Sequence, residues 1–325
     1  MRVAAVDIGT NSTRLLIAEA EAAGGVLGEL LRRSQVTRLG AGVDSAGRLS
    51  EAASERVFRT LAAYRREIDN YGCEANLAVL TSAVREASNG DSFAERVRAG
   101  YGLDAHVLIG EEEAHLTFLG AMSGRAEGER VGARTPTVVI DIGGGSTEFI
   151  AGIGHTAGFH VSLPVGVVRM SERHIHSDPP AAAQLQSLAL DARTVFLEGL
   201  PPAERAPVEH GIAVGGTATS AAAIDQALDP YDPARVHGYT LPLATIELLL
   251  ARMAEMTEEE RRVLVGLDPD RAPTIVAGMV VLSEALRAFE LDQVEVSEHD
   301  ILHGGALRLA GAAGASSQPP TSASD

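Results

Sequence analysis

The chain has 325 residues, of which 45% are hydrophobic and 4% aromatic, and its formal net charge is −17 at pH 7. This length exceeds one typical domain and the apolar content suffices for aliphatic cores, so we expect two domains and exclude a wholly disordered chain. The acidic balance argues against a general nucleic-acid or anionic-membrane binder. The single cysteine, Cys73, excludes an intramolecular disulfide or a Cys-rich zinc site.

All 27 basic side chains are arginine. Because lysine is absent, the chain has no Walker-A lysine, no Schiff-base lysine and no kinase-type catalytic lysine. Any phosphate chemistry must therefore use arginine, backbone N–H groups or a metal ion.

Two apolar segments were weighed as targeting or membrane signals. The run Met1–Asp7 reaches an acidic residue too early for a signal peptide, and Ile275–Leu282 is shorter than the roughly 20 apolar residues that span a bilayer. We therefore expect a cytoplasmic protein with neither a membrane nor a nucleic-acid partner. Residues 311–325 are small and rich in Ser and Pro, which predicts a disordered tail.

Hydrophobic periodicity predicts alternating strands and helices. Strands are predicted at Val3–Val6, Leu15–Ala18, Asn76–Leu80, Val107–Ile109, Thr137–Ile140, Gly211–Val214 and Val294–Val296. Helices are predicted at Arg48–Asp69, Glu111–Met122, Ala181–Leu197, Leu243–Met256 and Thr274–Leu291. The Gly- and Arg-rich segment Ser123–Pro136 predicts a linker. Such alternation is typical of an α/β protein.

One short pattern occurs twice. Val6–Thr13 and Ile140–Thr147 share Asp, Ile, Gly, Ser and Thr at equivalent positions, each after a β run and before another apolar run. A single copy is compatible with a turn in which Asp bonds its own backbone. Two copies, the second with Gly-Gly-Gly-Ser-Thr, favour two related domains that share a ligand site.

The composition of this turn suits phosphate. Glycines allow a tight turn and close approach of a ligand, and exposed N–H groups with Ser and Thr hydroxyls accept phosphate oxygens. The aspartate that ends each strand would repel phosphate unless a cation lay between them, which implies Mg²⁺. Two such turns facing each other would hold a phosphate chain from both sides.

Within the actin, sugar-kinase and heat-shock-chaperone superfamily, the sequence resembles the exopolyphosphatase / guanosine pentaphosphate phosphatase family. The matching motifs are DIGTNSTRLLI (Asp7–Ile17), TRLGAGVDSAGRLS (Thr37–Ser50), TSAVREASNG (Thr81–Gly90), GEEEAHLTFLG (Gly110–Gly120), VIDIGGGSTEF (Val139–Phe149), LPVGVVRMSE (Leu163–Glu172), AVGGTATSAAA (Ala213–Ala223) and VSEHDILHGGAL (Val296–Leu307).

The resemblance implies an α/β fold of two actin-like (ribonuclease H-like) domains with an interdomain active-site cleft. Domain I would cover residues 1–123 and domain II residues 124–310. It also implies an enzyme that hydrolyses terminal phosphate from inorganic polyphosphate, a Mg²⁺ (or Mn²⁺) cofactor and a homodimer. The resemblance is to the short, two-domain branch without the C-terminal helical domains of longer members, which implies an expected preference for shorter polyphosphates.

Glu113 matches the family's catalytic glutamate, in Gly110–Ala114, and is the expected general base that deprotonates the attacking water. Glu112 is the alternative. Acidic residues in a first helical turn are also favoured by the helix dipole alone. Repulsion among clustered acids would raise the pKa of Glu113.

Asp141 and Glu148 flank the second Gly-rich turn, which folds them towards each other. Both suit Mg²⁺, directly or through water, and either could also polarise the nucleophilic water, so both are candidate catalytic and metal residues. Asp7 is the equivalent candidate metal ligand in the first domain.

The candidate phosphate-binding residues come from both turns and from family motifs. Arg14 and Arg85 match family phosphate positions, where an arginine fork suits bidentate contacts. The Gly215–Thr217 turn repeats the nest pattern, and its ligand stays open. The complete candidate set is Thr10, Asn11, Ser12, Thr13, Arg14, Arg85, Gly143, Gly144, Gly145, Ser146, Thr147, Gly215, Gly216 and Thr217.

Three other features are given no catalytic role. His174 and His176 would align on one strand face but lack a third metal ligand nearby. His303 stands where the family that the sequence resembles usually has Arg, so the sequence leaves its role, including any phosphate contact, open. Glu258–Arg262 is interpreted as a solvated helix face.

Competing functions remain open on the sequence. Guanosine pentaphosphate (pppGpp) presents a terminal phosphoanhydride like that of polyphosphate, so the motifs do not separate the two substrates. A sugar kinase or ATPase of the same fold would require nucleotide. A non-catalytic polyphosphate or nucleotide sensor, or an actin-like assembly module, would have no need of Glu113, Asp141 and Glu148.

Overall fold

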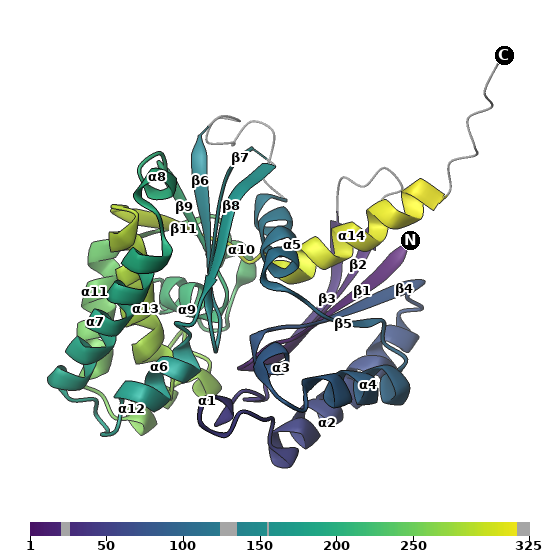
Figure 1. Ribbon diagram of the computed structural model, residues 1–325, viewed down its shortest axis with the longest axis horizontal. Helices are drawn as coiled ribbons and strands as arrows, with labels where there is room; N and C mark the ends of the chain where they lie inside the picture. The colour runs from purple at the N-terminus through teal and green to yellow at the C-terminus, as the bar shows by residue number, and fades with distance from the viewer. Residues whose placement is uncertain (21–26, 124–134, 155, 317–325) are drawn as a thin grey trace.

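In a computed structural model, the described residues (1–20, 27–123, 135–154 and 156–316) form two β-sheets with helices around and between them (Figure 1). The first sheet has the strand order β3-β2-β1-β4-β5 and the second the order β10-β11-β9-β6-β7-β8. The strands are β1 (Arg2–Ile8), β2 (Ser12–Ala20), β3 (Leu27–Val36), β4 (Ala75–Leu80), β5 (Ala105–Val107), β6 (Pro136–Ile142), β7 (Thr147–Ile153), β8 (Thr156–Leu163), β9 (His210–Val214), β10 (Tyr239–Pro242) and β11 (Gln293–Val296).

The helices occupy most of the remaining chain. They are α1 (Val43–Ala46), α2 (Glu51–Asn70), α3 (Ser82–Glu86), α4 (Gly90–Tyr101), α5 (Gly110–Met122), α6 (Val167–His174), α7 (Ala182–Gly199), α8 (Pro202–Arg205), α9 (Gly216–Asp225), α10 (Pro233–Val236), α11 (Leu243–Ala254), α12 (Glu258–Arg262), α13 (Ile275–Ala288) and α14 (Ile301–Ser316), with a 3₁₀ turn at Pro269–Arg271. The predicted α/β class is confirmed.

The two sheets repeat one plan, as the duplicated motif predicts. β1 pairs antiparallel with β2 and parallel with β4, and β6 pairs antiparallel with β7 and parallel with β9. The hairpin turns also match, because the Gly9 N–H donates to the Ser12 carbonyl at 2.9 Å and the Gly143 N–H donates to the Ser146 carbonyl at 2.9 Å. The repeated sequence therefore produces a repeated backbone.

Helix α2 illustrates how local sequence sets an element. Ser50 caps its N-terminus by accepting a hydrogen bond from the Ala53 N–H, which satisfies one of the free backbone donors of the first turn. Val57, Leu61 and Ile68 recur at helical spacing and are buried against the first sheet.

Helices α5 and α14 lie between the two sheets (Figure 1). Phe118 of α5 packs on the inner face of the second sheet, whereas Leu302 and Ala306 of α14 pack on the first sheet. The two helices approach so closely that a methyl group at Gly304 would lie 1.8 Å from the Leu116 carbonyl oxygen. The crossing lies between the two halves of the molecule, by which we mean the first and the second sheet, each with the helices packed on it. The predicted domain boundaries at residues 123 and 310 stay predictions.

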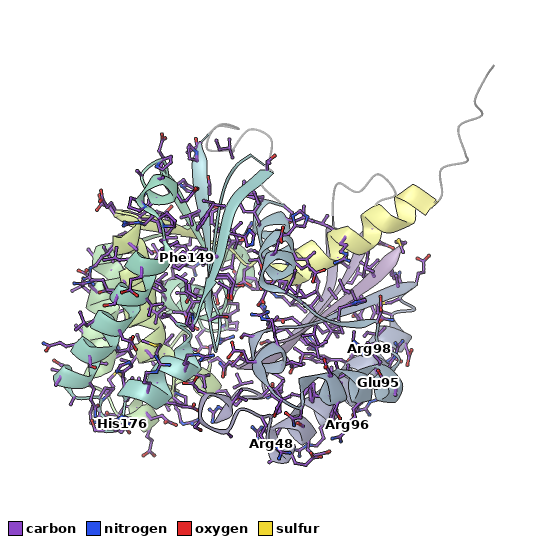
Figure 2. The ribbon with its side chains drawn as sticks, viewed as in Figure 1. Arg48, Glu95, Arg96, Arg98, Phe149 and His176 are labelled. Atoms are coloured by element: carbon purple, nitrogen blue, oxygen red, sulfur yellow. The ribbon has the colours of Figure 1, made fainter. Side chains whose placement is uncertain are left out.

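The outer helices enclose the second core. Phe149 of β7 is fully buried, and its ring lies 5.0 Å from that of Phe196 on α7 (Figure 2). In the described residues no helix combines the length and the apolar character that crossing a bilayer requires.

Several expectations about elements were wrong in detail. β3 was missed, because its charged, partly exposed sequence lacks a strong strand signal, and the predicted strand at 107–109 is β5, which ends at Val107. Helix α14 continues to Ser316, so the disordered tail predicted from residue 311 is helical up to that point. Residues 317–325 lie outside the described residues, as do residues 124–134 of the predicted linker.

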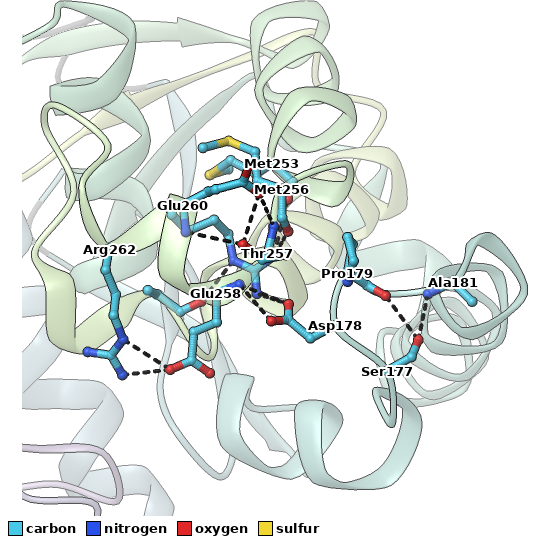
Figure 3. Close-up of polar contacts among 12 residues, drawn as sticks. Ser177, Asp178, Pro179, Ala181, Met253, Met256, Thr257, Glu258, Glu260 and Arg262 are labelled. Atoms are coloured by element: carbon cyan, nitrogen blue, oxygen red, sulfur yellow. Dashed lines mark hydrogen bonds and ion pairs between the residues drawn. The ribbon is translucent and has the colours of Figure 1, made fainter.

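Two polar segments also differ from expectation. His174 ends α6 rather than lying on a strand, and its Nε2 lies 2.8 Å from Asp191. Arg261 of α12 is buried, and it donates to backbone carbonyls that include those of Met253 and Ala272. The Glu258 N–H donates to Asp178 at 2.8 Å (Figure 3), so this helix anchors neighbouring loops instead of presenting only a solvated face.

The α5–α14 crossing yields a stability prediction. Gly304→Ala should lower the free energy of unfolding by about 1–3 kcal/mol, because the added methyl group forces the helices apart. Gly311→Ala, in the same helix, meets no atom within 4 Å and should raise it by about 0.5–1 kcal/mol through helix propensity. Urea unfolding curves measure both, and a Gly304 variant as stable as wild type would contradict the close crossing.

Candidate active site

The two hairpins place their strand-end residues opposite each other. In the second hairpin Asp141 is the direct cross-strand partner of Glu148, as predicted from the turn between them. In the first hairpin the equivalent partners are Asp7 and Arg14. The same backbone therefore carries two acids in one half and an acid with a base in the other.

These residues surround a small cavity of about 80 Å³ between the halves. The turns themselves touch, because a methyl group at Gly144 would lie 2.9 Å from the Asn11 backbone nitrogen. The predicted site residues that line the cavity are Asp7, Thr10, Asn11, Ser12, Arg14, Glu113, Asp141, Gly143, Gly144, Ser146, Glu148, Gly215, Gly216 and Thr217. The structure thus brings candidate residues from four separate motifs together.

Four predicted phosphate-binding residues do not line this cavity. Thr13 is buried with its hydroxyl 3.0 Å from that of Thr37, and the Thr147 hydroxyl donates to the Val165 carbonyl. Arg85 donates to Glu113 at 2.8 Å and to the Leu108 carbonyl at 2.9 Å. Gly145 lies against Ser82 and Thr10 of the first half.

Glu113 lies in the first turn of α5 and its side chain is buried, whereas Glu112 is exposed and caps the Ile109 N–H. Of these two candidates only Glu113 lines the cavity. Burial raises the pKa of Glu113 and the Arg85 ion pair opposes this rise. Burial, rather than the acidic repulsion expected from the sequence, is therefore the main cause.

The Asp141–Glu148 pair carries an electrostatic cost. Burial raises the pKa of Asp141 to about 7 against the attraction of Arg14, and Glu113 adds to the rise. Burial also raises the pKa of Glu148 well above its usual value, although hydroxyls of Ser146 and Ser162 donate to it at 2.6 and 2.7 Å. The pair is suited to accept a proton or a cation.

Arg14 is held by two carboxylates. Its guanidinium donates to Asp7 at 2.7 and 2.9 Å and also to Asp300, which precedes α14. Burial alone would raise the pKa of Asp300, but Arg14 and Arg32 lower it to about 2, so Asp300 is ionised. Sequence reasoning missed Asp300, which lies three residues before His303 in the VSEHDILHGGAL motif.

His303 does not line the cavity. Its ring is buried and stacks on that of His299 with the centroids 3.9 Å apart. Burial lowers the pKa of His303 to about 3, so this side chain is neutral. The structure therefore offers no cation at this position.

Arg271 is a second residue that sequence reasoning missed. Arg271 is the last residue of the 3₁₀ turn Pro269–Arg271, which carries no recognisable motif. Its guanidinium packs directly on Gly216, where an added methyl group would lie 1.6 Å from Nη1 of Arg271. Burial lowers the pKa of Arg271. Among the described residues its guanidinium has no hydrogen-bond or ion-pair partner.

A second cavity of about 760 Å³ adjoins the small one. Arg14, Gly215, Gly216 and Arg271 line both cavities, so the two share a wall. Part of the larger cavity is apolar, and its lining includes Tyr231, Leu228, Leu264, Val265 and Leu267.

The donor set fits a hard divalent cation. Asp7 Oδ1 is buried without a hydrogen-bond partner, and Asp141 and Glu148 add carboxylate oxygens to the same cavity. No cluster of three or more His, Cys, Asp or Glu side chains within the described ranges has a metal-holding arrangement by itself. Mg²⁺ commonly uses one or two carboxylates and takes its other ligands from water and substrate phosphates.

Two α/β halves of one topology, meeting at a carboxylate-lined cavity, define a protein of the actin-like fold class. The chain belongs to the Ppx/GppA phosphatase family, whose sequence profile matches residues 3–311. Exopolyphosphatase 2 of Mycobacterium tuberculosis is similar to it, with 39% identity covering 95% of this chain and 99% of the relative.

Solved structures give the same result. An Aquifex aeolicus member of the Ppx/GppA family superposes with a TM-score of 0.78 at 31% identity, covering 98% of this chain and 99% of its own. An exopolyphosphatase from Cytophaga hutchinsonii superposes with a TM-score of 0.84 at 25% identity, covering 96% and 98%.

The raised pKa of Asp141 predicts a pH-dependent stability. Between its ordinary value near 4 and about 7, the folded state holds more protons than the unfolded state, so ionisation on going to higher pH destabilises the fold. Without divalent cations, Asp141→Asn should therefore be more stable than wild type at pH 8 by about 1–4 kcal/mol, and this difference should shrink towards pH 4.

Thermal unfolding at both pH values measures this difference, with the exposed Asp91→Asn as control. If Asp141→Asn gained the same stability at pH 4 and at pH 8, the pKa of Asp141 would not be raised in the folded protein.

Proposed function

We propose that the protein is an exopolyphosphatase that removes terminal phosphate from inorganic polyphosphate by direct attack of water. The observation that carries the proposal is one cavity in which Glu113 of the first half meets Asp141 and Glu148 of the second, beside two N–H-rich turns. Relatives named exopolyphosphatase across nearly the whole chain support the same activity.

Glu113 is the proposed general base. Its carboxylate lies in the cavity, and Arg85 donates to Oε2, which fixes the side chain and keeps it available as an acceptor for the proton of water. The raised pKa makes it a stronger base than an exposed glutamate.

Asp141 and Glu148 would hold Mg²⁺, which would neutralise charge on the phosphate oxygens when bound. Ser146 and Ser162 orient Glu148 by donating to Oε1. Backbone N–H groups of the two turns, other than those of Gly9 and Gly143 that already donate to the Ser12 and Ser146 carbonyls, would surround the terminal phosphate and stabilise the charge that develops in the transition state. No covalent intermediate with the protein is required.

The rest of the polymer would occupy the larger cavity. Arg271 lines both cavities and its guanidinium has no hydrogen-bond or ion-pair partner among the described residues, so it suits a phosphate next to the one being cleaved. Arg33, which lines only the larger cavity, has no carboxylate partner either and donates to the Arg32 carbonyl. Arg14 is engaged by Asp7 and Asp300, which makes it a weaker candidate for direct phosphate contact than the sequence indicated.

Glu113→Gln tests the base. This substitution should lower kcat by about 10²–10⁴-fold, because it removes the proton acceptor but preserves the shape of the side chain. Glu112→Gln, one residue earlier and pointing away, should stay within about threefold of wild type. Phosphate release from polyphosphate measures both, and unchanged turnover in the Glu113 variant would remove the assignment.

A pppGpp 5′-phosphohydrolase is the second candidate. The apolar wall and Tyr231 of the larger cavity give room and a stacking surface for a nucleoside, which polyphosphate does not need. An ATPase or sugar kinase would use the same wall, and a non-catalytic sensor would bind polyphosphate without releasing phosphate.

Substrate and metal are tested together. Phosphate release is measured with polyphosphates of several lengths, pppGpp and ATP, with Mg²⁺, with Mn²⁺ and after chelation. We expect release from short polyphosphates that falls at least about 100-fold without divalent cation. Exclusive turnover of pppGpp would support the second candidate, and full activity after chelation would reject the metal ligands. The cytoplasmic location and the homodimer remain predictions.

A further inference from the structure

The two halves are also joined on a side of the site away from the α5–α14 crossing. There, α6 of the second half lies beside α1 and α3 of the first (Figure 1). Arg169 of α6 donates to Asp44 and, at 2.6 Å, to Glu86, so one guanidinium contacts two carboxylates of the other half. We call this contact, together with the bond described next, the Arg169 bridge.

Arg169 also contacts the second Gly-rich turn. Its Nε donates to the Gly145 carbonyl at 2.8 Å. Just before it, the Val167 and Val168 N–H groups donate to the Gly143 and Gly144 carbonyls, both at 2.9 Å. The helix start that carries Arg169 therefore fixes the backbone orientation of the turn proposed to bind the terminal phosphate.

The carboxylate partners connect the bridge to the proposed base. Glu86 ends α3 directly after Arg85, whose guanidinium binds Glu113. A chain of contacts thus runs from the Gly145 carbonyl through Arg169 and Glu86 to the helix that holds Glu113. The Arg169 side chain is 12% exposed, whereas those of Asp44 and Glu86 are 39% and 41% exposed, so the guanidinium is largely shielded from water but its two carboxylate partners are not.

We propose that Arg169 is a positioning residue, which sets the distance between the phosphate-binding turn of the second half and the general base of the first. This inference rests on the proposed hydrolase function of the cavity. Small displacements of reacting groups strongly reduce rates. Loss of the bridge should therefore affect turnover more than substrate affinity, because Arg169 does not line the small cavity itself.

The test compares three variants in the polyphosphate assay. Arg169→Gln should lower kcat by about 10–100-fold with KM changed by less than about threefold. Arg169→Lys should fall between Gln and wild type, because an ammonium group keeps the charge but cannot form the planar fork. Asp44→Asn with Glu86→Gln should also lower kcat, because it removes the cross-half contacts while the Gly145 bond stays possible.

Arg96→Gln is the matched control. Arg96 also contacts two carboxylates, Glu51 and Glu55 at 3.1 and 3.2 Å, but it lies on the outer surface of the first half (Figure 2). This variant should keep wild-type kcat and KM.

Amide hydrogen exchange gives a readout that needs no activity. In Arg169→Gln the Val167 and Val168 amides should exchange at least about tenfold faster, while the amides of α2 stay unchanged. If wild type releases no phosphate, the proposed function fails and exchange alone still tests the bridge. The inference would be overturned if Arg169→Gln kept both the exchange rates and the kcat of wild type. It would also be overturned if amides exchanged faster throughout the chain, because Arg169 would then have a general structural role.

Discussion

The joint burial of three carboxylates governs the site. Glu113, Asp141 and Glu148 share one small cavity, and each has a raised pKa. Charges without full compensation in such a place cost several kcal/mol, so the arrangement persists only because the surrounding backbone holds it. Its natural complement is positive charge. In the proposed function a polyanion that arrives with a divalent cation would meet that need, which would let a chain with a net charge of −17 take a phosphate polymer as substrate.

The duplicated hairpin shows how one backbone serves two purposes. At equivalent positions the first hairpin has Asp7 opposite Arg14 and the second has Asp141 opposite Glu148. Arg14 is further held by Asp300, so the first hairpin is largely compensated within the protein, although Asp7 Oδ1 keeps no partner. The uncompensated charge is concentrated in the second hairpin. In the proposed function this asymmetry would place the cation on one side of the cavity and leave the other side to bind phosphate through backbone N–H groups.

The sequence was most informative where function depends on local backbone. The turns after Asp7 and Asp141, and the position of Glu113 in a first helical turn, could be predicted because a few consecutive residues determine them. Arg271 could not, since it reaches the site through packing of segments distant in sequence and lies in no recognised motif. Asp300 lies in the VSEHDILHGGAL motif, but its contact with Arg14 joins segments distant in sequence, which the motif alone does not reveal. Arg85 was predicted to bind phosphate, whereas in the structure it donates to Glu113, because a family position fixes a neighbourhood and not a partner.

These contacts show what the absence of lysine and the use of arginine alone contribute to the site. A guanidinium can bind two groups in one plane, and the structure uses this capacity to join carboxylates and carbonyls: Arg14 joins Asp7 to Asp300, and Arg169 joins Glu86 to Gly145. Most positive charge near the site therefore organises acids of the protein and is not offered to the substrate. Arg271 lines both cavities without an ion-pair partner among the described residues, and Arg33 lines the larger one with only a backbone contact. In the proposed function, much of the affinity for the polymer would therefore come from the N–H groups of the turns and from the cations that the substrate brings.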